Sequence, residues 1–242
     1  MFAPVLFNSV LGKRPAYSQK ILSLSPILYY PMLESSGTTA ENLGSVASGD
    51  GTYSGITLAS AAGPMTSELA PLADGTNDHL DMYSANFNTA FDGNTGSLSF
   101  WFQMSAAGVW EDSTQRQFIK LFVDASNGIS VGRTTTNNQI EFIHEGGGTV
   151  KTTDVTSLAG STAWHHMAFT WGSGSATAYV DGSAETALTS LGTYAGSLSA
   201  TRTTAFATST VPAQVTSGYM QHIAIFDAKL AQADITLLAA TI

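Results

Sequence analysis

Cysteine is absent from this sequence of 242 residues, which excludes disulfides, thiolate zinc sites and thiol nucleophiles. Charged side chains are also scarce, because they make up 11% of the residues against roughly 25% in an average soluble domain. Long helices usually carry Glu and Lys on their solvent-exposed face, so this composition favours β-sheets. Hydrophobic residues reach 43%, which allows a large core and excludes a disordered chain.

Basic residues are the rarer of the two charged kinds. Nine Lys and Arg stand against 18 Asp and Glu, and the formal net charge is −9. The basic residues are scattered, with only Lys13 and Arg14 adjacent. Nucleic-acid binding requires clustered cations that neutralise phosphates, so we expect no nucleic-acid partner. No apolar run approaches the roughly 20 residues of a transmembrane helix, so we expect no membrane partner either.

The first 20 residues differ from the rest, because they mix apolar side chains with prolines and have no obvious partner strand. We predict that residues 1–20 form an N-terminal arm. Its large apolar side chains would be costly to leave in water, which favours docking on a neighbouring subunit. A tail packed on its own domain, or a frayed one, is the alternative. The residues expected to make the contact are Phe2, Val5, Leu6 and Phe7.

From residue 21 onward, short apolar segments alternate with turns rich in Gly, Asn and Ser. Their pattern is typical of β-strands, which are shorter and richer in aromatic and β-branched residues than helices. Strands are predicted at 21–28, 98–104, 118–123, 139–143 and 220–227.

A hairpin is the clearest local prediction. Met167–Trp171 and Ala176–Val180 flank a Gly-Ser turn, and Asp181-Gly182 follows as a second turn. Residues 231–239 are the only segment for which we expect a helix, of one or two turns. Many short strands without a break in composition predict one all-β domain over residues 21–242, an antiparallel β-sandwich with at most one short helix near the C-terminus.

Five motifs occur in the order seen in a known family. They are Tyr29-Tyr30-Pro31-Met32-Leu33-Glu34, Asp74-Gly75-Thr76-Asn77-Asp78, Ser97-Leu98-Ser99-Phe100-Trp101-Phe102, Trp164-His165-His166-Met167-Ala168 with Tyr179-Val180-Asp181-Gly182, and Ile223-Ala224-Ile225-Phe226-Asp227. On these motifs, residues 24–240 resemble the laminin-G-like branch of the concanavalin A-like lectin/glucanase superfamily. The resemblance implies a concanavalin A-like jelly roll. Members often carry an acidic residue just before the apolar run of the last strand, where this chain has Gln221 and His222.

Three large or charged side chains in these motifs have expected structural roles. Trp101 and Trp164 are apolar masses suited to the space between two sheets. Glu34, close to the first strand, is expected to accept hydrogen bonds from backbone N–H groups rather than to take part in chemistry.

A glucanase would need two carboxylates roughly 5 Å apart, one as general acid and one as nucleophile. The glucanases of the superfamily carry a Glu-x-Asp-x-x-Glu run on one strand, which this sequence lacks. Glu111 and Asp112 would point to opposite faces of a strand, and the spacing of Glu141 and Glu145 suits a helix better. We therefore expect no catalytic residue and no enzymatic activity.

The adjacent histidines His165 and His166 raise the possibility of a metal site. In a strand their side chains face opposite sides, so they cannot bind one ion together. We expect one half-buried and one surface histidine, with no metal site and no cofactor. Calcium-binding members of the superfamily use loop carboxylates, and a structural calcium is left open.

Trp110 is the candidate ligand-binding residue, because it lies in a polar segment and lectin sites stack an exposed aromatic ring on a sugar. The alternative is that Trp110 covers the edge of the core or a subunit interface.

Two functions remain, and they belong to different classes. The first is a non-enzymatic structural protein of a virus particle, a decoration or appendage protein of a tailed phage. Such a protein would dock on virion proteins such as the major capsid protein, form a homo-oligomer, with a trimer expected from local symmetry, and be located in the virion. The apolar stretch at the N-terminus precedes the first positive charges, unlike a secretory signal, which agrees with this expectation. The second is a carbohydrate-binding module or adhesin that recognises a cell-surface or matrix glycan.

Overall fold

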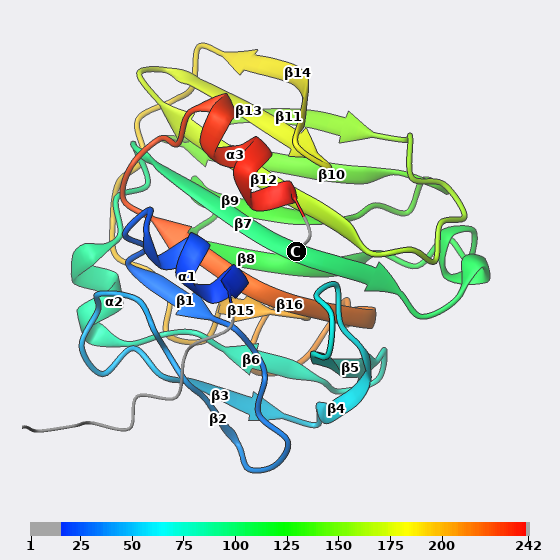
Figure 1. Cartoon of the computed structure of the whole chain (residues 1–242). Helices are drawn as coiled ribbons and strands as arrows, with labels where there is room; N and C mark the ends of the chain where they lie inside the picture. Colours follow the sequence, from blue (N-terminus) through cyan, green and yellow to red (C-terminus); the bar gives the residue numbers. More distant parts are fainter. Residues whose placement is uncertain (1–15, 241–242) are drawn as a thin grey trace, which may run out of the picture.

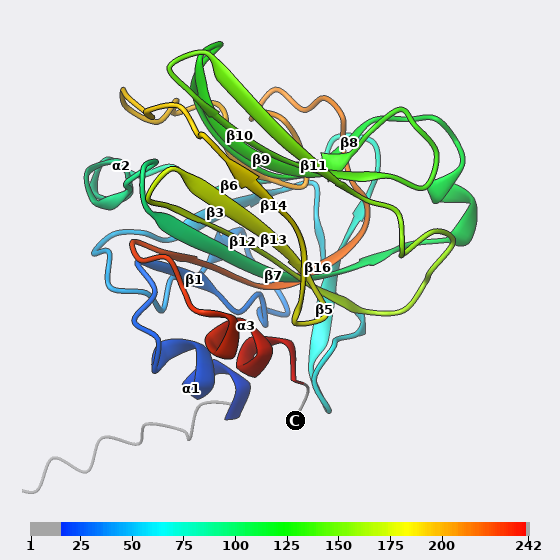
Figure 2. The same ribbon diagram turned by 90° about the horizontal axis from the view of Figure 1, so that it is seen from above.

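A computed structural model describes residues 16–240 and places their strands in two antiparallel sheets that lie face to face (Figures 1 and 2). Sheet A has the order β14-β13-β12-β7-β16-β5-β4, with β1 paired to β16. Its strands are β1 Leu28–Tyr30, β4 Thr57–Ala62, β5 Leu69–Asp74, β7 Gly96–Met104, β12 His165–Gly172, β13 Ser175–Val180, β14 Ser183–Thr189 and β16 Ser217–Phe226.

Sheet B has the order β11-β10-β9-β8-β15-β6-β3-β2. Its strands are β2 Thr39–Ala40, β3 Gly51–Ser54, β6 His79–Asp81, β8 Arg116–Asp124, β9 Asn127–Arg133, β10 Ile140–Gly146, β11 Thr149–Val155 and β15 Thr203–Ala205. The predicted fold class, an all-β jelly roll of two antiparallel sheets, is confirmed. The predicted hairpin is also confirmed, because β12 and β13 pair directly across their turn.

Short helices complete the described part of the chain: α1 Ala16–Leu22, α2 Ala85–Ala90, α3 Gln232–Ala239 and the 3₁₀ turn η1 Ala107–Trp110. The helix expected near the C-terminus is confirmed as α3. The limit of one helix is wrong, since α1 and α2 are present as well. Among residues 16–240, no helix combines the length and apolar character that crossing a membrane would take.

The strand predicted at residues 21–28 is wrong over most of its length. α1 continues to Leu22, and β1 begins only at Leu28. Tyr17 and Ile21 are four positions apart, so in a helix they lie on one face, and both are buried. The apolar pattern around Ile21 therefore belongs to the end of a helix.

The first core lies between the sheets, and we call it the inner core. Alternate side chains of each strand project into it, as Phe100 and Phe102 of β7 do. Rings from both sheets meet there, with Phe102 stacked on Phe118 at a centroid distance of 4.9 Å. The inner core includes Leu98, Phe100, Phe102, Trp110, Phe118, Ile119, Leu121, Val131, Phe142, Met167, Phe169, Trp171, Ala205 and Ile225.

A second core, which we call the outer core, lies on the other face of sheet A. The helices α1 and α3 lie side by side over this face (Figure 2). The outer core consists of Tyr17, Ile21, Tyr29, Met65, Trp101, Ala168, Tyr179, Ala224, Phe226, Leu230, Ile235 and Leu238. Sheet A is therefore buried on both faces over the area that the two helices cover.

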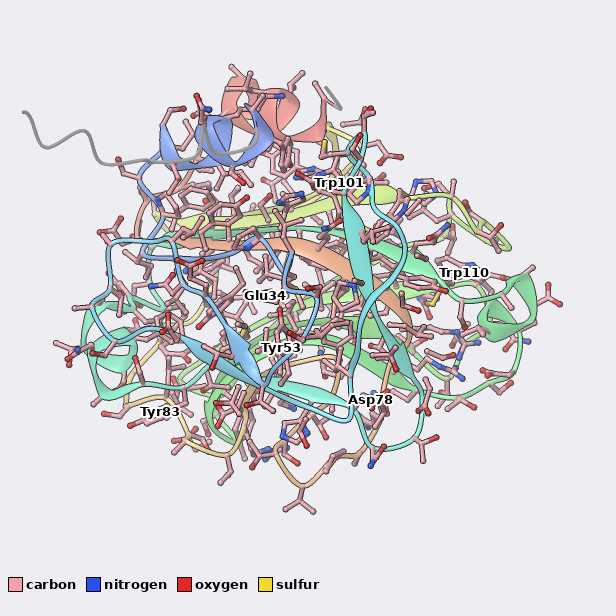
Figure 3. All side chains as sticks on the ribbon, turned by 60° about the horizontal axis from the view of Figure 1, so that its bottom comes forward. Glu34, Tyr53, Asp78, Tyr83, Trp101 and Trp110 are labelled. Atoms are coloured by element: carbon pink, nitrogen blue, oxygen red, sulfur yellow. The ribbon has the colours of Figure 1, made fainter. Side chains whose placement is uncertain are left out.

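The expectation that Trp101 and Trp164 fill the space between the sheets is wrong. Trp101 stands between Phe100 and Phe102 in β7, so it must face the opposite side, and it is buried under the helices (Figure 3). Trp164 is half-buried against the outer core and donates its indole N–H to the Ala62 carbonyl at 3.0 Å.

Glu34 has the expected structural role. Its Oε1 accepts the backbone N–H of Glu41 at 2.8 Å, and its Oε2 accepts the hydroxyl of Tyr53 at 2.9 Å (Figure 3). The carboxylate thereby ties the segment after β1 to β3.

The predicted arm residues Phe2, Val5, Leu6 and Phe7 lie outside the described residues, so their contact with a neighbouring subunit stays a prediction. The boundary drawn after residue 20 falls inside α1.

Candidate functional site

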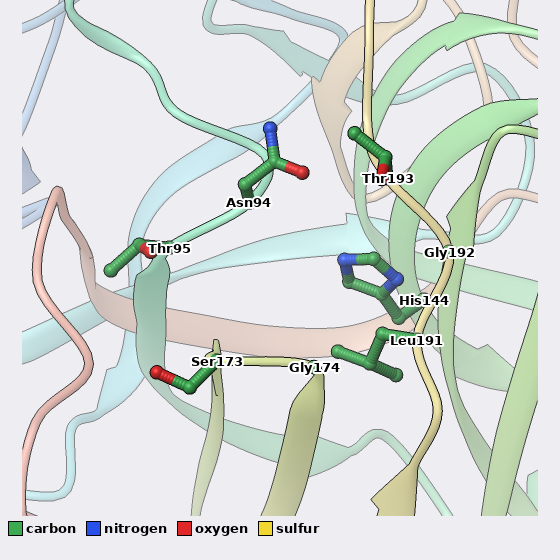
Figure 4. Close-up of a pocket in the computed structure, with 8 residues that line it drawn as sticks. All are labelled: Asn94, Thr95, His144, Ser173, Gly174, Leu191, Gly192 and Thr193. Carbon is green, nitrogen blue, oxygen red and sulfur yellow. The ribbon is translucent and has the colours of Figure 1, made fainter.

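A cavity of about 290 Å³ opens at one end of the sandwich, where three loops meet the strand β10 (Figure 4). We call it the rim cavity. The loops precede β7, join β12 to β13, and follow β14. The rim cavity is lined by Asn94, Thr95, His144, Ser173, Gly174, Leu191, Gly192 and Thr193.

The loop that follows β14 is held rigidly over the cavity. The side-chain amide of Asn94 donates to the Tyr194 carbonyl and its oxygen accepts the Tyr194 N–H, both at 2.9 Å. Gly192 lies so close to β10 that a Cβ on it would come within 1.8 Å of the Gly146 carbonyl oxygen. Only glycine permits this approach. The walls of the cavity are therefore preformed, as is usual for ligand sites.

His144 of β10 lies at the floor of the cavity and is 1% exposed. Its Nε2 is 3.1 Å from the Gly93 carbonyl, and because a carbonyl only accepts, Nε2 carries the proton. Its Nδ1 has no hydrogen-bond partner among the described residues. Burial lowers the pKa of His144, and the hydrogen bond to Gly93 opposes this shift. The floor is thus a neutral imidazole.

The mouth of the cavity carries hydroxyl groups. Those of Thr95, Ser173 and Thr193 make no hydrogen bond to another residue within 16–240, and all three residues line the cavity. The ammonium group of Lys229 is directed at the β12–β13 turn instead, where it donates to the carbonyl and hydroxyl of Ser175 at 3.1 and 2.8 Å. None of the lining residues is charged, so the cavity suits an uncharged ligand rich in hydroxyl groups.

Trp110 does not form a binding surface, and the expectation that it is exposed is wrong. The side chain is 0% exposed, packs edge-on against Phe102 at 6.2 Å, and donates its indole N–H to the Ser161 carbonyl at 2.7 Å. A ring enclosed in this way cannot stack on a sugar. The alternative weighed for Trp110, a cover for the edge of the core, is the arrangement in the structure.

Trp110 is held by an ion pair beside it. Arg116 donates to both carboxylate oxygens of Asp112, at 2.7 and 2.5 Å, and Arg133 lies 3.2 Å from the same group. The Arg133 guanidinium also donates to the Trp110 carbonyl. Hydrogen bonds from Arg116 lower the pKa of Asp112 to about 2.

The adjacent histidines face opposite sides, as predicted. His166 is 0% exposed, and its Nε2 lies 2.8 Å from the Ser99 hydroxyl. His165 lies 2.8 Å from the Asp181 carboxylate and 2.7 Å from the Ser161 hydroxyl. The expectation of one half-buried histidine is met by His165, whose side chain is 15% exposed, but the expectation of a surface histidine is wrong, because His166 is fully buried. Among residues 16–240, no group of three or more His, Asp or Glu side chains is arranged to hold a metal ion.

Glu141 and Glu145 share one face of β10 but are four residues apart, which in a strand is about 13 Å and too far for a glycosidase pair. Glu141 instead lies directly opposite Asp154 of β11. Burial, and then the charge of Asp154, raise the pKa of Glu141. The depression beside Glu141 has a volume of about 20 Å³, enough for a water molecule and not for a sugar ring.

None of the residues predicted to form a site lies in the rim cavity. The cavity joins residues 94, 144, 173 and 193, which no local spacing connects. The run Gly146-Gly147-Gly148 was the one available signal, since Gly146 makes the close contact with the loop above. The role of this run cannot be recognised locally, because the segment that packs on it, around Gly192, is almost 50 residues away.

Known proteins share this architecture. The structures include the botulinum neurotoxin serotype D binding domain (TM-score 0.62, 13% identity, 89% of this chain and 51% of that chain) and the receptor-binding domain of the mosaic serotype C/D neurotoxin (TM-score 0.66, 12% identity, 89% and 50%). A third is the serotype D ligand-binding domain in complex with N-acetylneuraminic acid (TM-score 0.64, 13% identity, 91% and 52%). This chain spans about half the length of those chains. Because the sequence identities are only 12–13%, the similarity concerns the fold alone.

Sequence comparison identifies the family. No curated protein sequence matches the chain. A family model of the laminin-G type, described as the concanavalin A-like lectin/glucanases superfamily, matches residues 74–236, which is more than half of the chain. Together with the two-sheet jelly roll, this match shows that the chain belongs to the concanavalin A-like lectin/glucanases superfamily.

Proposed function

We propose that this chain is a non-enzymatic carbohydrate-binding domain and that the rim cavity is its ligand site. The observation that carries the proposal is a preformed, uncharged cavity with hydroxyl groups at its mouth and a buried neutral imidazole at its floor. Its volume of about 290 Å³ is at the lower end of the range for ligand pockets, which suits one or two sugar rings.

The chemistry of the lining supports a sugar over other small molecules. The hydroxyls of Thr95, Ser173 and Thr193 can both donate and accept, which matches the hydroxyl groups of a pyranose. Leu191 supplies an apolar side chain for the C–H face of the ring. A neighbour of the same fold, the serotype D neurotoxin domain, is known in complex with N-acetylneuraminic acid, so this fold can bind a sugar. That sugar is an anion, whereas the uncharged lining of the rim cavity favours neutral sugars.

Binding is tested by titrating the chain with a panel of neutral monosaccharides and disaccharides, using calorimetry and saturation-transfer NMR. We expect Thr193→Trp, which fills the mouth of the cavity, to lower the affinity of any bound sugar at least tenfold. Thr52→Trp is the matched control, because Thr52 is an exposed threonine on β3, at the far side of sheet B from β10. Binding that survives Thr193→Trp, or that Thr52→Trp also removes, would contradict the assignment of the site.

A structural role in a virus particle is the second candidate. α1, the first element of the described chain, lies on the outside of sheet A (Figure 2). The low charge content suits a subunit whose surfaces are buried in an assembly, because charges would have to be desolvated there. In this role the chain is a virion component that contacts the major capsid protein and associates as a trimer through Phe2, Val5, Leu6 and Phe7.

The second candidate is tested by the mass in solution of the whole chain and of a version that begins at residue 16. A trimer that becomes a monomer on truncation is the expected outcome. A monomer in both cases would count against assembly through the arm and leave the carbohydrate-binding role unaffected.

A further inference from the structure

A chain of hydrogen bonds crosses the outer core from the β4–β5 loop to α1. Glu68 Oε2 lies 2.7 Å from Nε2 of His222, which donates to it. The other ring nitrogen of His222 is 2.9 Å from the Tyr29 hydroxyl, which in turn is 2.9 Å from the Ser18 hydroxyl. One path of hydrogen bonds thus joins the β4–β5 loop and β16 to β1 and α1 at the start of the described chain.

His222 sits where β16 departs from regular pairing. Its φ is 55°, and the register with β7 shifts between Gln221 and Ala224. A non-glycine residue in this left-handed region costs free energy, so the contacts around it must hold it in place. Those contacts include Glu68, Tyr29 and the ring of Tyr17 in α1, whose centroid lies 4.6 Å from that of the imidazole.

The helix α1 is held in position by its contacts with the outer core. It has seven residues and no acidic side chain in its first turn, so helix formation alone contributes little to its stability. Tyr17 and Ile21 are buried. The Tyr17 hydroxyl donates to the Leu238 carbonyl at 2.6 Å and accepts the indole N–H of Trp101 at 2.7 Å. Loss of these contacts would free the helix.

A second buried imidazole shares this face. His166 lies edge-on to Trp101 at a centroid distance of 5.3 Å, and its Nδ1 has no hydrogen-bond partner among the described residues. A proton on Nδ1 would therefore be buried without an acceptor. Burial lowers the pKa of His166 to about 3 and also lowers the pKa of His222.

The charges that face the two rings come from several elements. Glu68 of the β4–β5 loop favours a proton on His222, and Asp181 after β13 favours one on His166. Lys20 of α1 opposes a proton on His166, and so does a positive charge on His222. The hydroxyls of Tyr17 in α1 and Tyr29 in β1 are the other titratable groups near the two rings. Asp234, the one carboxylate of α3, accepts the backbone N–H of Ala231 at the start of its own helix.

We propose that the outer core is an acid-sensitive latch, in which mild acid releases α1 from sheet A and exposes the floor formed by Tyr29, Trp101 and His166. In the open state the imidazoles reach water and take up protons near their ordinary pKa of about 6.5. In the closed state they resist protonation, so each pH unit below about 6.5 favours opening by up to tenfold for each ring. Release of α1 detaches residues 16–22 from sheet A and makes their apolar side chains available to a partner.

The absence of cysteine allows a direct test with a single introduced thiol. Ile21→Cys places it on the buried side of α1, and Ser23→Cys is an exposed reference in the same segment that corrects for the pH dependence of alkylation. We expect the alkylation rate of Ile21→Cys, relative to Ser23→Cys, to rise between pH 7.5 and pH 5.0 by up to about thirtyfold for each ring that takes up a proton on opening. Ala205→Cys, in the inner core, should show no comparable rise.

Histidine variants in the Ile21→Cys background identify the groups responsible. His166→Gln or His222→Gln should remove much of the rise, whereas His144→Gln, which replaces a buried imidazole outside the outer core, should keep it. The latch is overturned by a flat rate at Ile21→Cys, by an equal rise at Ala205→Cys, or by a rise that persists in both variants. Two independent substitutions keep the test decisive if one of them does not fold.

Discussion

The inner and outer cores of this domain share sheet A but are stabilised differently. The inner core is closed by a second sheet and consists of aliphatic and aromatic side chains. The outer core is closed by two short helices and a loop, and hydrogen bonds of Tyr17, Ser18, Tyr29, His166 and His222 run through it.

Because of this difference, the two sides of sheet A should respond differently to acid and to substitution. The hydrophobic effect does not require a particular bond geometry and does not depend on pH. The inner core should therefore tolerate small shifts of its side chains and should stay folded in acid. Buried polar groups depend on every partner being present and on one protonation state. We therefore expect the outer core to open first, and the following experiments test that order.

The largest effect is expected in the inner core. Phe169→Ala removes a fully buried ring between the sheets and should lower the free energy of unfolding by about 3–5 kcal/mol, measured by urea denaturation. Ile21→Ala, in the outer core, should cost less, because the loss is limited to the docking of one short helix. If Phe169→Ala and Ile21→Ala lowered the free energy of unfolding equally, the two cores would not differ in stability.

Acid should act mainly through the outer core. The pKa of His166 is about 3 in the folded chain and about 6.5 when unfolded, so between these values the unfolded state binds more protons. Stability therefore falls as the pH decreases from about 6.5 and levels off near pH 3. From pH 7 to pH 4 this group alone should lower the free energy of unfolding by about 3 kcal/mol.

The measurement is the urea midpoint as a function of pH. His166→Gln should have a flatter profile than the natural chain over the same range. A profile that keeps its slope in this variant would assign the acid response to other groups, such as His144 at the rim cavity.

A smaller effect is expected for Tyr17→Phe. This change removes one oxygen and leaves the Trp101 indole N–H and the Leu238 carbonyl without their partner, which should cost about 1–3 kcal/mol. Because the ring itself is kept, hydrogen exchange should increase in α1 and α3 and stay unchanged in β8 and β9. Equal increases in all four elements would show that the two cores open together.

The smallest effect should come from Asp112→Asn, at the edge of the inner core. Asp112 is about one third exposed, and solvent screens its interaction with Arg116 and Arg133. Its folded pKa of about 2 lies below the usual value near 4, so its contribution is present above pH 4 and is lost as the pH falls toward 2. The melting temperature at pH 7 should fall less than in Tyr17→Phe, and a larger fall would contradict this ranking.

Much of the fold could be predicted because it depends on residues close together in the sequence. The turn at Asp181-Gly182 has positive φ at both residues, as a tight turn requires, and it follows the predicted hairpin. The helix α3 lies within the predicted 231–239. Strand order and the face that each strand presents could not be derived in this way, and the position of Trp101 was wrong for that reason.

The candidate site could not be predicted, because its parts come from distant segments. The two hydrogen bonds between Asn94 and Tyr194 span 100 residues, and they decide where the loop above His144 lies. Trp110 was chosen from the polarity of its neighbours in the sequence, but burial depends on neighbours in space.

A sandwich of short antiparallel strands can be predicted from the amino-acid sequence, because the alternation of side chains and the geometry of turns act between neighbouring residues. The burial of sheet A on both faces, the contact of His222 with the carboxylate of Glu68, and the shared cavity of Ser173 and Thr193 arise from the packing of distant segments. Contacts of this kind depend on the curvature and pairing of whole sheets, which no short stretch of sequence contains.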